Sequence, residues 1–243
     1  MSDRDTQDES LRRHFSATRW SRALAVGVPL DAELVNSFAA SYWREVYLWL
    51  RRDRGLSNEE AKDLTQAFFV HLVEDRVLEK FSAAQGRLRT FLKASLANFA
   101  TDRYRRAQAQ RRGGGLVHVS FDAMEVGRLD ELARGTETPD ALFDREWRLN
   151  TLRSAMQAVQ KRCEESGRSA YWVVYEMHDV NPGPDGPPTY RALGERLGLS
   201  EQEVTRVLAS VRREVRLEVM RQVSEQVAAE GDLHEELRDL LGE

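Results

Sequence analysis

The chain has 243 residues, and 40 acidic against 36 basic side chains give it a formal net charge of −4. Its single cysteine excludes an internal disulfide, and no run of about 18 apolar residues offers a membrane span. The opening stretch MSDRDTQDES is not typical of a signal peptide, so we expect a soluble, cytoplasmic protein without a membrane partner.

The charges are distributed unevenly along the chain. Between Arg87 and Arg112, eight basic residues stand against one acid, Asp102, and the segment has a net charge of +7. Between Glu214 and Glu243, nine acids outnumber three arginines, and the net charge is −6. Because a local cluster of positive charge attracts phosphates whatever the mean charge, the basic segment is a candidate nucleic-acid surface.

Apolar residues recur at helical spacing and period-2 apolar runs are nearly absent, which predicts an all-α protein. The stretch after Arg112 begins with three glycines and continues with mixed polar sequence as far as Pro139, a composition that indicates a linker. We therefore expect two small helical domains joined by a flexible linker, the C-terminal one with a helix-turn-helix. The expected parts are a leader at 1–30, a helical domain at 31–112, the linker at 113–140, a helical domain at 141–222 and an acidic tail at 223–243.

Three helices are predicted in the first domain. The first ends at Gly55, and the second begins at a cap formed by Ser57 or Asn58. A third, long helix begins near Leu88. Its apolar stripe stops at Asp102, so its last turns are expected to project from the core as a basic rod.

The second domain is predicted to contain helices around Phe143–Cys163 and Ala170–Met177, a loop at NPGPDGPP and then a helix-turn-helix. A helix at Tyr190–Leu197 leads through a glycine turn into SEQEVTRVLASVRRE, whose apolar residues share one face. Ser200 and Glu203 match a capping box, which gives the opening acids a local role. The opposite face carries no acid and is formed by Gln202, Thr205, Arg206, Ala209, Arg212, Arg213 and Arg216. An ordinary helical hairpin is the alternative interpretation.

Three stretches, in this order, resemble bacterial sigma factors of the extracytoplasmic-function (ECF) group. DLTQAFFVHL resembles the D-L-x-Q-x-x-F helix, and FLKASLANFATDRYRRAQAQRR resembles the following helix, with Phe91 where Trp is usual. TYRALGERLGLSEQEVTRVLASVRRE is similar to the C-terminal helix-turn-helix of the family. In the recognition helix Glu203, Thr205 and Val207 replace the usual Thr, Lys and Arg.

The resemblance implies an alternative sigma factor that binds core RNA polymerase, directs it to promoter DNA and helps to open the duplex. Polymerase would be contacted by Asp63, Gln66 and Phe69. The upstream promoter element would be contacted, through the loop SAAQGRL and the basic helix, by Lys80, Gln85, Arg87, Arg89, Asn98, Asp102, Arg103, Arg105, Arg106, Arg111 and Arg112. The distal element would be read by Gln202, Thr205, Arg206 and Arg213. An anti-sigma or other regulatory protein is left open as a further partner.

Two rival functions remain. One is a helix-turn-helix regulator that acts without polymerase, and the other is a polymerase-binding adaptor that has lost promoter reading. An enzyme is not expected, because the five histidines show no metal-ligand spacing and the triple glycine is not followed by the Lys and Ser or Thr of a phosphate loop. We expect no catalytic residue, no metal and no cofactor.

The acidic tail allows two interpretations. Its leucines recur at helical spacing at Leu233, Leu237, Leu240 and Leu241. The tail could fold back on a basic surface as an internal brake, or it could be a solvated terminal helix.

Overall fold

The computed structural model describes residues 32–81, 87–106, 123–224, 226–227 and 230–241. Every regular element in these ranges is helical, which confirms the predicted all-α class. The predicted leader at 1–30 lies outside the described residues. None of the described helices is long and apolar enough to cross a membrane.

The described residues form two compact units, one of residues 32–150 with 223–241 and one of residues 151–222. The larger unit contains α3 (Ala32–Arg54), α4 (Asn58–Glu74), the 3-10 turn η1 (Leu78–Lys80), α5 (Leu88–Arg106), α6 (Ala123–Ala133), the first part of α7 (Pro139–Glu165) and α11 (Glu230–Leu241). The smaller unit contains the rest of α7, α8 (Ser169–Tyr175), a π-helical turn (Glu176–Val180), α9 (Tyr190–Leu197) and most of α10 (Glu201–Ser224).

These units differ from the expected parts of the chain in two ways. The smaller unit begins at residue 151, in the middle of α7, and not at 141. Residues 223–241, expected as a separate tail, belong to the larger unit, where Val223, Val227, Leu233 and Leu240 are buried. The larger unit is therefore completed by residues from the C-terminal end of the sequence.

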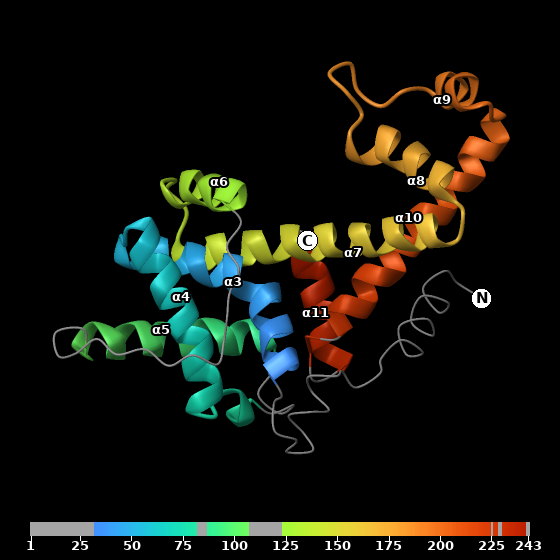
Figure 1. Ribbon diagram of the computed structural model, residues 1–243. Coiled ribbons are helices and arrows are strands. Elements are labelled where there is room, and N and C mark those ends of the chain that lie inside the picture. The colour runs from blue at the N-terminus through green and yellow to red at the C-terminus, as the bar shows by residue number, and fades with distance from the viewer. Residues whose placement is uncertain (1–31, 82–86, 107–122, 225, 228–229, 242–243) are drawn as a thin grey trace. The chain divides into compact units, whose positions relative to one another are not determined.

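Aromatic side chains join the first three helices of the larger unit. The ring centroids of Phe38 in α3 and Phe69 in α4 lie 6.2 Å apart, edge to face. Phe68 of α4 makes a similar contact of 5.4 Å with Phe99 of α5. Such pairs add about 0.5–1.5 kcal/mol to the hydrophobic gain from burial. Over the first three turns of α5 (Figure 1), Leu88, Leu92, Leu96 and Phe99 are buried in the same core.

The helix ends follow the local sequence signals. Gly55, after α3, has φ +60°, a left-handed conformation that favours glycine. Of the two predicted caps for α4, the structure uses Ser57. The Ser57 N–H donates to Glu60 Oε2 at 2.9 Å, and the Glu60 N–H donates to Ser57 Oγ at 3.4 Å. This reciprocal capping box satisfies two backbone donors at the start of α4.

The predicted flexible linker at 113–140 is contradicted over Ala123–Ala133, which form α6. Leu129 is fully buried and Val126 is 4% exposed, because α6 packs on α3. A polar contact reinforces the packing: Arg51 and Tyr47 of α3 both donate to Asp130 Oδ1. The apolar residues of this stretch are few, but α3 supplies the surface that they cover.

Candidate nucleic-acid interface

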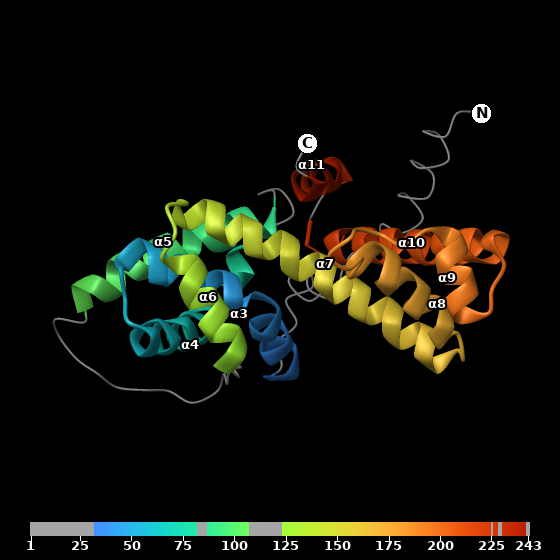
Figure 2. The ribbon, with the colours of Figure 1, turned by 90° about the horizontal axis from the view of Figure 1, so that it is seen from above.

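A tight turn joins α9 and α10 in the smaller unit (Figure 2). Gly198 ends α9 with φ +71°, in the left-handed region. A Cβ on Gly194 would lie 2.4 Å from the carbonyl oxygen of Leu199, whose N–H donates to the Gly194 carbonyl at 2.9 Å. The turn thus needs two glycines. Of these two, only Gly198 was predicted at the turn; the sequence signal for Gly194 is a glycine inside the short helix that precedes it.

Glu203, in the first turn of α10, caps the helix itself, as the sequence predicts. The Ser200 N–H donates to Glu203 Oε2 at 2.7 Å, and the Glu203 N–H donates to Ser200 Oγ at 3.2 Å. The hydrogen bond from the Ser200 backbone lowers the pKa of Glu203. Its carboxylate is therefore engaged with the helix terminus.

The two faces of α10 differ in exposure as predicted. The apolar face is buried at Val204, Val207, Leu208, Val211 and Val215. The opposite face is exposed at Gln202, Thr205, Arg206, Ala209 and Arg213. Within the described residues, neither Arg206 nor Arg213 has an ion-pair partner; the Arg206 Nε only donates to the Gln202 carbonyl, at 3.4 Å. We call Gln202, Arg206 and Arg213 the exposed stripe.

In the described part of the chain Arg212, unlike Arg206 and Arg213, is already paired with a carboxylate. Its Nε and its terminal nitrogen donate to the Asp179 carboxylate at 2.7 and 2.8 Å, and Asp179 lies in the π-helical turn after α8. The hydrogen bonds that Arg212 donates to Asp179 raise the pKa of Arg212. Arg212 therefore links α10 to the π-helical turn.

The residues predicted to contact polymerase are divided between surface and core. Asp63 is exposed on α4 and Gln66 is half-buried one turn later. Phe69 is only 1% exposed and packs against Phe38 and Phe68, so its predicted contact with a partner is wrong for this structure. It faces the core because α4 must bury this side against α3 and α5.

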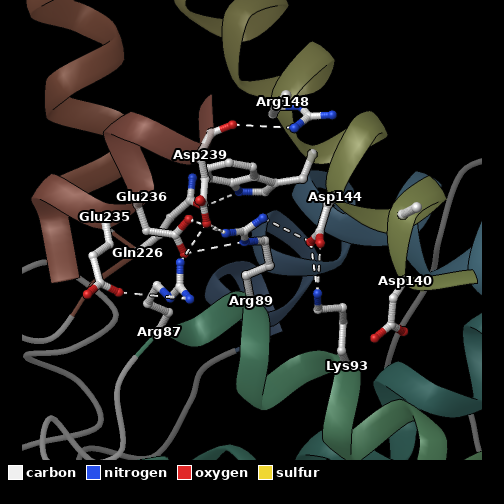
Figure 3. Close-up of polar contacts among 12 residues, drawn as sticks. Arg87, Arg89, Lys93, Asp140, Asp144, Arg148, Gln226, Glu235, Glu236 and Asp239 are labelled. Carbon is white, nitrogen blue, oxygen red and sulfur yellow. Dashed lines mark hydrogen bonds and ion pairs between the residues drawn. The ribbon is translucent and has the colours of Figure 1, made fainter. Parts of the chain in front are cut away.

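Arg89 was predicted to contact DNA, but the structure buries it in the larger unit. Its side chain is buried, with 5% exposure, and lies among carboxylates from two other helices (Figure 3). Its guanidinium donates to Glu236 at 2.7 Å and to Asp239 at 2.6 Å in α11, and to Asp144 at 2.9 Å in α7. It also stacks over the Trp147 ring, 4.4 Å from its centroid.

Two neighbouring cations share these partners. Arg87 donates to Asp239 at 2.6 Å, with Glu235 at 4.0 Å, and keeps 27% of its side chain exposed. Lys93 donates to both oxygens of Asp144, at 3.0 and 2.9 Å. We call Arg87, Arg89 and Lys93 the basic cluster. All three members are paired with carboxylates of the larger unit, whereas Arg87 and Arg89 were predicted to contact promoter DNA.

The remaining residues predicted to contact DNA in the larger unit lie outside the basic cluster. Lys80 is exposed at the end of η1, and Asn98 and Asp102 are exposed on α5. The last turn of α5 includes Arg103, Arg105 and Arg106. The side chains of these three arginines are not among those that the structure describes. Gln85, Arg111 and Arg112 lie outside the described residues.

Comparison with known proteins gives no relative: no family model, no curated protein and no solved structure matches the chain. In the described ranges, no group of histidine, cysteine and acidic side chains is arranged to hold a metal ion.

Proposed function

We propose that this protein is an alternative sigma factor of the ECF type, which binds core RNA polymerase, directs it to promoters and helps to open the duplex. The observation that carries the proposal is the exposed stripe of α10, a polar and basic surface that follows a tight glycine turn and lies opposite a buried face. The order of the three sequence motifs supports the same function.

The exposed stripe has the chemistry of a major-groove reader. A glutamine can pair bidentately with adenine and an arginine with guanine, and each such pair contributes about 1–3 kcal/mol of discrimination. Gln202 and Arg206 lie one turn apart, near the start of α10, where a recognition helix presents its residues to base edges. Because Glu203 is engaged by Ser200, its charge is directed toward the helix start.

A polymerase contact would use the exposed side of α4. Asp63 is exposed there, while the other side of the helix is fixed by the buried rings of Phe68 and Phe69. A helix held in this way presents its outer residues in a defined orientation, which favours specific recognition.

The second candidate function is an adaptor that binds polymerase without reading promoters. It is favoured by one observation: each member of the basic cluster is already paired with a carboxylate. Promoter opening by the purified protein with core enzyme distinguishes it from a sigma factor.

The proposal is tested by run-off transcription with core RNA polymerase and genomic fragments. We expect the wild type to direct initiation at defined sites. Asp63→Ala with Gln66→Ala should weaken association with the core enzyme. The melting temperature should change little, because Asp63 is exposed, Gln66 is only half-buried, and substitutions outside the core usually change stability by about 0.5 kcal/mol.

Glu131→Ala serves as the control, because it removes an exposed acid from α6 in the same unit. It should leave core association unchanged. Equal affinity of the double variant and the wild type for core enzyme would contradict the role of α4, and absence of initiation with every fragment would contradict the sigma-factor proposal. Binding to a palindrome without polymerase would instead support the regulator.

A further inference from the structure

Helix α11 places its carboxylates on cations that the proposed function assigns to promoter DNA. Asp239 accepts hydrogen bonds from both Arg87 and Arg89, each at 2.6 Å, and Glu236 accepts from Arg89 at 2.7 Å (Figure 3). A carboxylate and a phosphate oxygen bind a guanidinium in the same geometry. A DNA phosphate that approached Arg87 would therefore compete with Asp239.

The inner part of this contact anchors the helix. Glu236 is fully buried and pairs with Arg89, which is 5% exposed. Leu233 and Leu240, on the same side of α11, are 1% and 7% exposed. Separating Arg89 from Glu236 would leave an uncompensated buried charge, which costs free energy. We therefore expect this pair to keep α11 docked when the outer contacts change.

The outer part is accessible to solvent. The side chains of Arg87, Asp239 and Glu235 are 27%, 42% and 56% exposed. Ion pairs at this exposure are weak and are screened by salt, so a competing polyanion can displace them. The contact thus has a fixed inner half and an exchangeable outer half.

We propose that α11 is an internal competitor of DNA: Asp239, with Glu235, withholds Arg87 from phosphates while the buried pair of Arg89 and Glu236 keeps the helix docked. The inference rests on the proposed function and adds a form of regulation to it. Of the two roles considered for the acidic tail, this inference favours the internal brake. The residues that act as the brake lie on the solvent-facing side of α11.

A matched pair of substitutions in the full-length protein tests the proposal. Asp239→Asn keeps an oxygen acceptor but removes the charge beside Arg87 and Arg89, and Arg89 keeps Glu236 and Asp144 as charged partners. Asp232→Asn removes the same charge from the same helix, and among the described residues Asp232 has no ion pair with the basic cluster. Affinity of each holoenzyme for a promoter duplex is measured as a function of salt, with melting temperatures as the control for folding.

We expect Asp239→Asn to bind the duplex more tightly at low salt, and Asp232→Asn to match the wild type. One additional phosphate contact steepens the salt dependence by about 0.9 in log–log slope, which corresponds to about threefold more affinity lost between about 50 and about 200 mM salt. The gain of Asp239→Asn should disappear when Arg87→Gln is added, because Arg87 is the cation that it releases.

Equal affinity of the two asparagine variants would overturn the inference, and so would a gain that persists with Arg87→Gln. In both cases transcription by the wild-type holoenzyme would leave the proposed function intact. If the wild-type holoenzyme neither binds nor transcribes any fragment, the proposed function fails and the inference fails with it.

Discussion

Glu45 is an acid in the core of the larger unit, with 1% of its surface exposed. Its Oε1 lies 3.4 Å from Asn150 Nδ2, and its Oε2 has no hydrogen-bond partner in the described part of the chain. Burial, with a smaller contribution from Glu146, raises the pKa of Glu45 to about 8. The side chain is therefore mostly protonated at neutral pH, which avoids an unpaired buried charge.

This pKa predicts how stability depends on pH. The ordinary value is 4.5, so the folded state holds a proton that the unfolded state has lost between pH 4.5 and about 8. The contribution of Glu45 to stability is full below this window and falls as pH rises through it, by at most about 1.4 kcal/mol per pH unit. Glu45→Gln removes the titration. We expect it to match the wild type at about pH 5 and to exceed its stability at about pH 8. Urea denaturation at both pH values measures the difference; parallel pH profiles would contradict the pKa.

At the scale of the element, the proposed reading residue of α10 and its capping residue are different side chains. Arg206 is exposed and has no ion-pair partner among the described residues, whereas Glu203 closes the capping box. We expect Arg206→Ala to weaken recognition of the distal promoter element without a change in melting temperature. Glu203→Ala should instead lower the melting temperature more than it lowers DNA affinity. In the proposed function polymerase would tether both units near the DNA and partly mask the loss of one contact, so affinity should also be measured without polymerase. Loss of binding in Glu203→Ala alone would show that the stripe does not read DNA.

The elements that could be predicted are those defined by neighbouring residues. Ser57 with Glu60, and Ser200 with Glu203, each form a cap within four residues, and the sequence locates both helix starts. The burial of Arg89 could not be predicted in this way, because its partner Glu236 lies 147 residues away. The same reason explains α6, which depends on a surface of α3, and Phe69, whose orientation depends on the packing of α4. Local chemistry predicts helix ends, whereas the exposure of a charged residue depends on distant contacts.

At the scale of the whole molecule, the net charge of −4 is a poor guide to DNA binding, because acids and bases occupy different segments. The last turns of α5 carry arginines that the sequence assigns to phosphates. Arg105→Ala with Arg106→Ala should lower affinity for all promoter sequences and flatten the salt dependence by about 0.9 per lost contact.

Arg134→Ala with Lys161→Ala provides the control for net charge, since it removes two cations whose side chains are 73% and 75% exposed elsewhere on the molecule. It changes the total charge equally but should leave the salt slope unchanged. If both double variants flatten the slope to the same extent, total charge and not the α5 cations governs binding.

The pairing of Arg89 with Glu236 also has a consequence for the order of events during synthesis. A ribosome adds residues 32–150 first and residues 223–241 only after the whole of the smaller unit. Until then the nascent larger unit lacks α11, and Arg89 lacks two of its three carboxylate partners. The described residues of the smaller unit, 151–222, are contiguous, and all of them leave the exit tunnel before α11 does. The larger unit can therefore be completed only after residues 151–222 of the smaller unit have been synthesised.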